Sequence, residues 1–519
     1  MAKKLISLVL AATLLLSVPL VAFGATAHNE ATCTNVPIIW MDGAFHDLYL
    51  YEGTDQQIVA SSGEGSDVFA ELGAKAATIV AEALAGSGKT FASIVNKLFG
   101  AIAFNKDGTS ANPGITRTSG EKKPSNASQL ANTDHTKNRN YYWHYDWRQS
   151  PLDLAVTFHD FVQQVKEKTG HSKVNVRTVS GSSTILMSYF YLYPEEEDFA
   201  SVLIVNSLHN GSGIFSQVFN RKVMIDNDAL GNTNMFSTWE IDDSLLKPLL
   251  KLLWDSGVLR IISTVGNALV IKRIINDVFE EGITPTLLTL PMSWAFCADD
   301  GYESAKQINF KGDPSWDKLV SIIDDYHYNV QQHSDELIKT AIANGVRVGI
   351  LSTYGSPGTP FVEDASASGD SVVEAALSSA GATVAPYGKQ LGKLGGLIYT
   401  QAIDDGHNHL SSDGCVDAST CLLPEQTWFM CGASHTQGFD SAVAFGEWFF
   451  DSKTTPSVFS NEDYPQYLTQ SADRSVVYPY TPTAGRSGIA GLLQGMFETV
   501  LHFFRFWLTL GTLWLGLFD

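Results

Sequence analysis

A serine lies between a predicted strand and a predicted helix near residue 180. Valines at 174, 176 and 179 indicate the strand, and the apolar run from Ile185 to Tyr193 indicates the helix. Between them lies the small-residue run Ser180-Gly181-Ser182-Ser183. A sharp strand-to-helix turn can expose a serine hydroxyl above the end of a sheet, where the hydroxyl acts as a nucleophile. Serine is also common in ordinary turns, so the motif alone leaves both interpretations open.

The choice of serine within this turn follows from the size of its neighbours. The positions two before and two after such a nucleophile are normally glycine, because the turn is tight. For Ser180 these positions hold Thr178 and Ser182, which are small but are not glycine. For Ser183 the preceding position is Gly181, but Ile185 follows and is too large. The sequence therefore favours Ser180.

A loop near residue 43 is a candidate for the second half of an oxyanion site. The apolar run Pro37–Met41 predicts a buried strand, and Asp42-Gly43-Ala44-Phe45-His46 follows as a loop. A serine hydrolase places one backbone N–H beside its nucleophile and another in a loop of this kind. A plain connection between a strand and a helix explains the loop equally well.

Two other motifs indicate different chemistry only weakly. Residues 83–90, Ala-Leu-Ala-Gly-Ser-Gly-Lys-Thr, loosely match a phosphate-binding loop. Such a loop follows a strand, whereas residues 74–85 have a helical composition, so we interpret Gly86-Ser87-Gly88 as a break between two helices. His407 and His409, with Asp413 and Asp417 nearby, lack the helical spacing typical of a metal site. No metal and no cofactor are predicted.

An ordered series of short stretches gives a more specific indication. Tyr145-Asp146-Trp147-Arg148, then a helix, then the serine turn, resembles the lecithin:cholesterol acyltransferase-like family of α/β-hydrolases, in an exported bacterial form. The resemblance covers about residues 35 to 440. The following stretches of the chain also resemble the family: 290–294, 300–302, 326–330, 345–351, 354–355, 369–374, 381–383, 416–421 and 427–429. One departure is Asp42, where the family commonly has proline.

The resemblance, together with chain order, implies the remaining site residues. An α/β-hydrolase requires its acid after the serine and its histidine after the acid. Asp370 and His435 meet that order, and His435 follows Thr427-Trp428-Phe429 as the family pattern places it, which favours it over His407 and His409. Ser180, Asp370 and His435 would form the catalytic triad, with the N–H groups of Gly181 and Ala44 binding the oxyanion.

Composition and the ends of the chain bear on location. The chain has 519 residues and a net charge of −21, which argues against a nucleic-acid partner. Residues 1–25 resemble a signal peptide, with Lys3 and Lys4 before an apolar run, so we expect export to the cell envelope, at the membrane or beyond the cell. Five cysteines, at 33, 297, 415, 421 and 431, leave at least one unpaired and do not have zinc-site spacing.

The predicted organisation is an α/β-hydrolase fold with a mostly parallel sheet. We expect the core in two parts, 33–215 and 341–480, with a flexible insertion at 105–140 and a helical cap at 216–340. The polar residues of 488–519 fall on one helical face, which predicts an amphipathic helix on a membrane surface. A membrane span and a helix docked on the protein itself are the alternatives.

The expected function is ester chemistry on an acyl substrate, most simply a lipid. Hydrolysis and acyl transfer share the acyl-enzyme, so the sequence does not separate them. The alternative is a non-catalytic envelope protein that keeps this fold and binds a lipid or a partner. The missing turn glycines favour that alternative, whereas Ser180, Asp370 and His435 in their proper order favour an enzyme.

Overall fold

The computed structural model describes the part of the chain that holds every predicted site residue. The described residues are 33, 35–41, 43–44, 48–49, 58–60, 74–75, 77–79, 81–115, 135, 137–226, 263–264, 266–393, 399–435, 443–471 and 475–482. The predicted signal peptide and the predicted helix at 488–519 lie outside them. Among the described residues, no helix has the length and apolar character needed to cross a bilayer.

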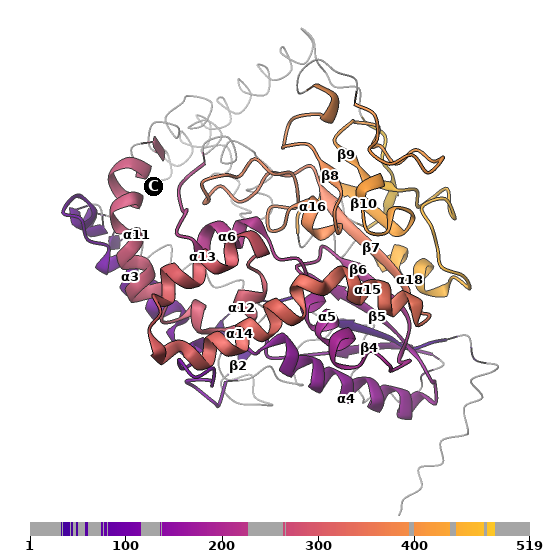
Figure 1. Cartoon of the computed structure of the whole chain (residues 1–519), viewed down its shortest axis with the longest axis horizontal. Helices are drawn as coiled ribbons and strands as arrows, with labels where there is room; N and C mark the ends of the chain where they lie inside the picture. Colours follow the sequence, from indigo (N-terminus) through magenta and orange to yellow (C-terminus); the bar gives the residue numbers. More distant parts are fainter. Residues whose placement is uncertain are drawn as a thin grey trace, which may run out of the picture.

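An eight-stranded sheet lies at the centre of this part of the chain (Figure 1). All neighbouring strands run parallel except one pair, Tyr467–Gln470 with Val477–Pro479, which is antiparallel. This arrangement confirms the predicted mostly parallel α/β sheet. The strands, in spatial order, are β12 (Val477–Pro479), β11 (Tyr467–Gln470), β10 (Thr427–Cys431), β7 (Arg347–Tyr354), β6 (Phe199–Val205), β5 (Val174–Val179), β1 (Ile38–Met41) and β4 (Asn140–Trp143).

Both faces of the sheet are buried, as the apolar runs in its strands require. In β1, Ile39 and Met41 pack into one apolar cluster, and Ile38 and Trp40 pack into another on the opposite face. The first cluster includes side chains of α4 (Pro151–Thr169), α5 (Ser182–Leu192) and α15 (Ser334–Ala343). The second cluster includes side chains of α18 (Val443–Asp451). The sheet is thus the middle of three layers.

Helix α4 shows how closely local sequence sets these elements. Ser150 caps its first turn by accepting a hydrogen bond from the Leu152 N–H, and Pro151 begins the helix. Gly170 ends it in a left-handed conformation, with φ of 72°. The helix buries an apolar stripe with helical spacing, formed by Leu154, Phe158, Phe161 and Val165.

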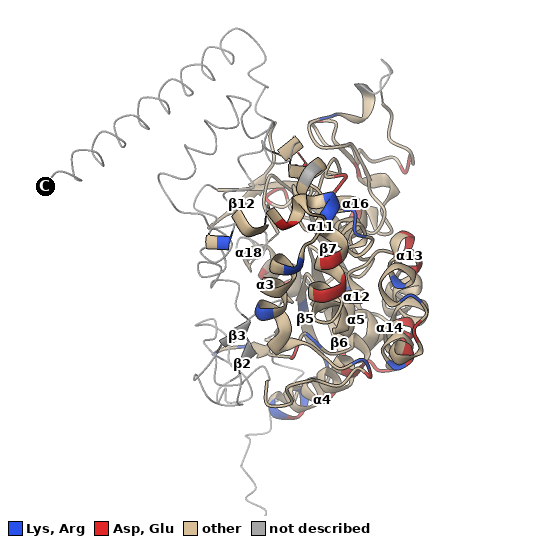
Figure 2. Ribbon diagram, turned by 90° about the vertical axis from the view of Figure 1, so that its left-hand side faces the viewer, with Lys and Arg blue, Asp and Glu red and all other residues tan. Residues whose placement is uncertain are grey.

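A third, smaller apolar cluster belongs to the helices that follow β6 in the chain. It joins Phe219, Phe279, Trp294 and Tyr302, among others. These helices are α6 (Gly213–Phe219), α11 (Lys272–Val278), α12 (Pro291–Ala295), α13 (Asp299–Phe310) and α14 (Asp317–Asn329). They form the described portion of the predicted cap; its residues 227–262 and 265 lie outside the described residues. Figure 2 shows charged residues along α4, α13 and α14, on helices around the sheet.

The remaining elements are short. Helix α3 (Lys89–Phe99) packs beside α11 and the π-helical turn η3 (Phe279–Ile283), away from the sheet (Figure 1). Two small antiparallel pairs stand apart from the main sheet, β2 (Leu48–Tyr49) with β3 (Ile58–Ala60), and β8 (Thr383–Val384) with β9 (Val416–Asp417). The other helical turns are η1 (Gly100–Ile102), η2 (Asn267–Ile271), η4 (Leu287–Thr289), η5 (Pro314–Trp316), η6 (Gln331–His333), α16 (Ala375–Ser378), η7 (Leu391–Lys393), η8 (Ala418–Thr420) and η9 (Pro424–Gln426).

Candidate active site

The strand order places a topological switch point between β1 and β5. From β1 the chain passes to β4 on one side, and then to β5 on the other side of β1. The connections that follow β1 and β5 therefore leave the sheet in opposite directions. In open α/β sheets, ligands bind at such a switch point, outside the carboxyl ends of the strands. Gly43 follows β1 and Ser180 follows β5, so both lie at this switch point.

Ser180 is held in a strained conformation between β5 and α5. Its φ is +53°, in the left-handed region that residues other than glycine rarely adopt. Its N–H donates to the Val205 carbonyl of the adjacent strand at 3.0 Å. The next residue, Gly181, is the N-cap of α5, and no side chain caps the helix there. The Gly181 N–H is thus at a helix start, where the positive end of the helix dipole favours a developing negative charge.

Hydroxyl groups stabilise the turn where glycines are usual. Ser182 is fully buried, and its hydroxyl donates to the Val179 carbonyl at 2.8 Å and accepts from the Val179 N–H at 2.9 Å. The Ser183 hydroxyl donates to the Ser180 carbonyl at 2.6 Å and accepts from the Leu208 N–H at 3.0 Å. Ser183 is therefore committed to backbone contacts, whereas Ser180 faces a histidine.

The three residues predicted as a triad lie in hydrogen-bond contact. The Ser180 Oγ is 2.8 Å from Nε2 of His435, and Nδ1 of His435 is 2.7 Å from Oδ2 of Asp370. Each residue is more than nine-tenths buried. A hydroxyl, an imidazole and a carboxylate in this order have the geometry of a base-activated nucleophile. Asp370 follows β7 and His435 follows β10, so all three come from the carboxyl edge of the sheet.

Backbone contacts fix the acid and the histidine together. Oδ1 of Asp370 accepts from the N–H groups of Val372 and Val373, both at 2.9 Å. The His435 N–H donates to the Asp370 carbonyl at 3.0 Å, and the Asn206 side chain donates to the His435 carbonyl at 3.2 Å. The imidazole is thus placed by main-chain bonds as well as by its own ring nitrogens.

Gly43, Ala44 and Gly181 meet in close contact with Ser180. A Cβ added to Gly43 would lie 3.4 Å from the Ser180 Cβ, which leaves no room for a larger side chain without adjustment. A Cβ added to Gly181 would lie 3.0 Å from the Ala44 Cβ and 2.9 Å from Cζ of Phe296. The two predicted oxyanion residues are therefore neighbours. The ring of Phe296 lies next to Gly181, and its centroid is 5.3 Å from that of Phe215.

The Tyr-Asp-Trp-Arg stretch is structural in this chain. Arg148 is buried and makes a bidentate pair with Asp146, through Nε at 2.8 Å and Nη2 at 2.6 Å. Nη2 also donates to the Ile115 carbonyl at 2.8 Å. The pair thereby anchors the first part of the predicted 105–140 insertion, whose residues 116–134 and 136 lie outside the described residues.

Burial shifts the pKa of two further groups near this edge. Burial lowers the pKa of His209 to about 4, so that imidazole is neutral at neutral pH. Burial raises the pKa of Glu374, whose carboxylate accepts the Gly213 N–H at 3.0 Å. Neither side chain forms a hydrogen bond with Ser180, Asp370 or His435 among the contacts of the described residues.

The weaker motifs take other roles. The Gly88 N–H donates to an Asp277 carboxylate oxygen at 2.8 Å, and the Thr90 N–H donates to Glu82 at 2.9 Å. Carboxylates thus occupy the helix start where a phosphate would bind, in agreement with the predicted break between two helices. His409 is buried between Gln466 and Asp405, at 2.8 Å and 2.9 Å.

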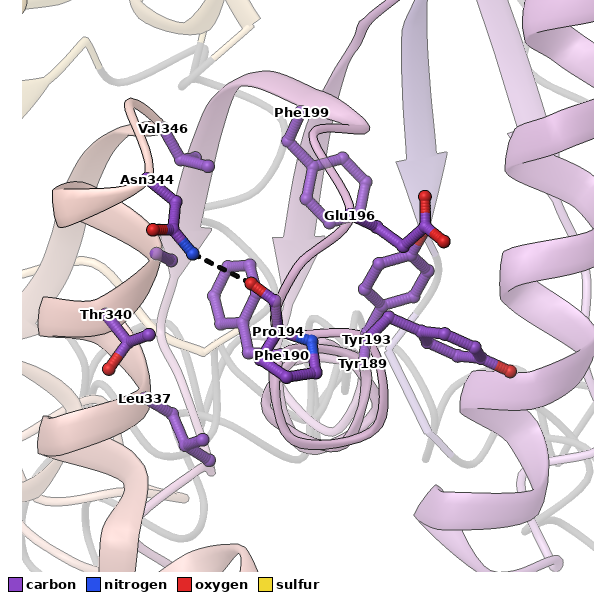
Figure 3. Close-up of a pocket in the computed structure, with 11 residues that line it drawn as sticks. Tyr189, Phe190, Tyr193, Pro194, Glu196, Phe199, Leu337, Thr340, Asn344 and Val346 are labelled. Carbon is purple, nitrogen blue, oxygen red and sulfur yellow. Dashed lines mark hydrogen bonds between the residues drawn. The ribbon is translucent and has the colours of Figure 1, made fainter.

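A surface pocket lies at the opposite edge of the sheet (Figure 3). It is lined by Tyr189 and Tyr193 of α5, by Phe199 at the start of β6, and by Leu337 of α15, among others. The Asn344 side chain donates across it to the Pro194 carbonyl at 2.7 Å. Because Ser180 follows the carboxyl end of β5, this pocket is separate from the serine site.

Two contributors to the site carried no clear signal in the sequence. Asn206 directly follows β6, has a positive φ of 42° and donates a hydrogen bond to the His435 carbonyl. An asparagine after a strand is an ordinary turn residue, so nothing in the sequence indicated this contact. Phe296 comes from the predicted cap region, more than a hundred residues from Ser180. Compared with known proteins, the chain matches no family model and no curated sequence.

Proposed function

We propose that this chain is a serine esterase or acyltransferase that acts on acyl esters. The observation that carries the proposal is the continuous chain of contacts from Ser180 through His435 to Asp370, at 2.8 Å and 2.7 Å. The strained φ of Ser180 and the strand-to-helix turn around it support the same reading. An α/β-hydrolase fold of the lecithin:cholesterol acyltransferase-like type accounts for the chain order of the three residues.

The proposed chemistry begins with proton transfer from Ser180. His435 Nε2 accepts the hydroxyl proton as Oγ forms a bond with the acyl carbonyl carbon. The carbonyl oxygen becomes an oxyanion, which accepts hydrogen bonds from the N–H groups of Gly181 and Ala44. The bond to the leaving alcohol then breaks, and His435 returns its proton to that alcohol. Asp370 keeps Nδ1 protonated and stabilises the imidazolium while it exists.

The second half of the cycle releases the acyl group. Water or another alcohol gives its proton to His435 and attacks the acyl carbon. The bond between that carbon and Ser180 Oγ then breaks, Oγ takes the proton back from His435, and an acid or a new ester is released. The apolar ring of Phe296 lies beside Gly181, with the Phe215 ring next to it, and these rings suit a hydrocarbon acyl chain. We propose lipids as the substrate class on this basis. The predicted export and the predicted helix at 488–519 would bring the enzyme to a membrane surface.

Covalent labelling tests the proposal directly. The full chain would be treated with a fluorophosphonate, and the adduct would be located by peptide mass. We expect one labelled residue, Ser180, with labelling lost in Ser180→Ala and His435→Ala and retained in Ser188→Ala. Ser188 lies on the same helix, and its hydroxyl donates only to the Thr184 carbonyl in the described structure.

A folded protein that takes no label on lipid vesicles would contradict the proposal. That result would favour the alternative of a non-catalytic envelope protein with the same fold. Label on another serine, unaffected by His435→Ala, would contradict the assignment of the nucleophile.

A further inference from the structure

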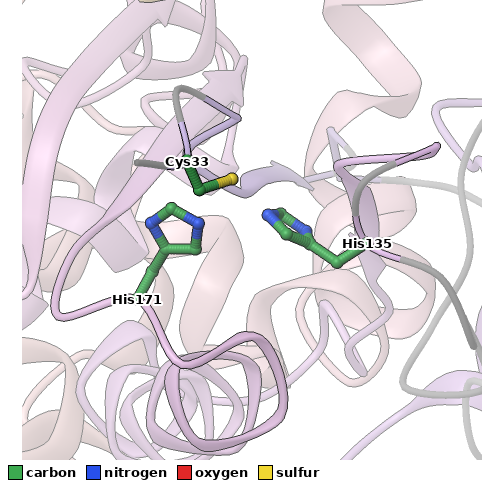
Figure 4. Close-up of side chains that lie close together, drawn as sticks. All are labelled: Cys33, His135 and His171. Carbon is green, nitrogen blue, oxygen red and sulfur yellow. The ribbon is translucent and has the colours of Figure 1, made fainter. Parts of the chain in front are cut away.

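One cysteine and two histidines converge at the edge of the sheet opposite Ser180. Figure 4 shows Cys33, His135 and His171 with the thiol directed between the two rings. Their ligand atoms all lie within 4.8 Å of one another. His171 is buried, and the other two are half-buried. The three come from distant parts of the sequence, so this convergence is produced by the fold alone.

The strand order explains how these segments meet. Cys33 lies shortly before β1, His135 shortly before β4, and His171 shortly before β5. These strands are neighbours in the sheet, in the order β5-β1-β4, and all are parallel. Residues that precede neighbouring parallel strands gather at the amino edge of the sheet. Ser180 follows the carboxyl end of β5, so the two sites are independent.

The ligand types select a class of metal. A thiolate with two imidazoles is a donor set for zinc and other late transition metals, whereas magnesium and calcium require oxygen ligands. Zinc bonds of about 2.3 Å to sulfur and about 2.0 Å to nitrogen place ligand atoms roughly 3.5 Å apart in a tetrahedron. The present separations are at most 4.8 Å, so side-chain adjustments of about 1 Å bring the ligands to these distances.

The surroundings hold the ligands near one another. His135 Nε2 lies 2.5 Å from the Asn35 carbonyl oxygen, so the segment that carries Cys33 also contacts the His135 ring. The ring centroids of His135 and His171 are 5.0 Å apart, in an edge-on arrangement. The two rings and the thiol therefore already face one volume, without any change in the strands behind them.

A second convergence, at His159, Glu196 and Asp198, provides a contrast. There the buried Asp198 is already paired with the Lys166 ammonium and hydrogen-bonded by Tyr189. A cation from the protein occupies the place that a metal would take. The Cys33 cluster instead brings together one thiol and two imidazoles, whose sulfur and nitrogen atoms are the ligand types that zinc prefers.

We propose that Cys33, His135 and His171 bind one zinc ion, with water in the fourth tetrahedral position. The ion joins the segments before β1, β4 and β5 and stabilises this edge of the sheet. Because the thiol loses its proton on binding and both imidazoles bind in the neutral form, zinc affinity falls as pH decreases. The role is structural and does not depend on the chemistry of Ser180.

The test uses the full chain with Zn²⁺ and Co²⁺ as probes. We expect one equivalent of zinc by elemental analysis after purification without chelator. In the cobalt-loaded protein we expect a near-ultraviolet sulfur-to-cobalt band and visible bands of a tetrahedral site. Cys33→Ser should abolish the sulfur band and weaken zinc binding by about two orders of magnitude or more. Even mutation of a residue that only hydrogen-bonds a metal ligand typically lowers metal affinity by about 10–100-fold. Cys415→Ser, at another cysteine, should retain both.

Stability provides a readout that does not depend on a variant's folding. Removal of zinc from the wild-type chain by a chelator should lower its thermal midpoint, and added Zn²⁺ but not Mg²⁺ should restore it. A folded wild-type protein that binds no zinc would overturn the proposal. Zinc and the sulfur band retained in both Cys33→Ser and His171→Asn would equally overturn it, because the metal would then be bound elsewhere.

Discussion

The substitution Asp370→Asn tests the proposed mechanism at one hydrogen bond. In the structure Oδ1 accepts two backbone N–H groups at 2.9 Å, and Oδ2 accepts from His435 Nδ1 at 2.7 Å. Asparagine should keep its carbonyl oxygen on the two backbone donors, because turning its amide toward them would leave both unpaired at about 1–3 kcal/mol each. Its NH₂ must then donate to Nδ1, which moves the ring proton to Nε2.

An Nε2 that carries a proton cannot accept one from Ser180. The same wrong tautomer costs about four decades in kcat in serine proteases. At 1.36 kcal/mol per decade this raises the barrier by about 5 kcal/mol. The assay is hydrolysis of a p-nitrophenyl acyl ester at neutral pH, with the thermal midpoint measured alongside. The midpoint should change little, since the side chains have the same shape.

Glu374→Gln is the matched control for a buried acid at the same edge. Its carboxylate accepts the Gly213 N–H, which a glutamine oxygen can also accept, and His435 bonds to Asp370 and Ser180 instead. We expect kcat near the wild-type value. If Asp370→Asn keeps more than about a tenth of wild-type kcat, the tautomer argument is refuted. An equal loss in Glu374→Gln would show that any lost buried charge has the same effect.

Three further predictions concern the turn and a buried histidine. Gly181→Ala should lower kcat by about two decades or more, because the added methyl would lie 2.9 Å from an aromatic carbon and displace an oxyanion N–H; unchanged kinetics would refute this. Ser182→Ala should lower the unfolding free energy in urea by about 1–3 kcal/mol through two lost backbone contacts, and Ser188→Ala by less. His209 has a folded pKa of about 4 against an ordinary value of 6.5, so the unfolded state binds more protons between these values. Stability should therefore fall by about 3 kcal/mol as pH drops from 6.5 to 4, and His209→Gln should remove that slope while His333→Gln keeps it.

Local pattern was sufficient for the elements that build the sheet. The strands β1 and β5 were predicted close to their observed bounds, because β1 is an apolar run and β5 carries valines at 174, 176 and 179. The observed α5 begins three residues earlier than the apolar run at Ile185 indicated. The reason is that Ser182, Ser183 and Thr184 bond the backbone within the helix start, which an apolar pattern does not reveal.

Contacts between distant segments were beyond such reasoning. The sequence placed Ser180, Asp370 and His435 in one site only through chain order and a resemblance, and it did not indicate Asn206 or Phe296. The cluster of Cys33 with the two histidines illustrates the same limit. Its members are separated by 102 and 36 residues, so no motif spacing connects them, and only the pairing of β1 with β4 and β5 brings them together.

The main-chain bond from His435 to the Asp370 carbonyl has a consequence for how such proteins diverge. Any pair of residues except one with proline at position 435 would form it, because it uses no side-chain atom. The loops after β7 and β10 would then keep their course in a descendant that had lost its acid or its base. The conformation of these loops can therefore be retained in evolution after the catalytic side chains have been lost. Enzymes and inactive descendants on this scaffold would differ in a few side chains while sharing one trace.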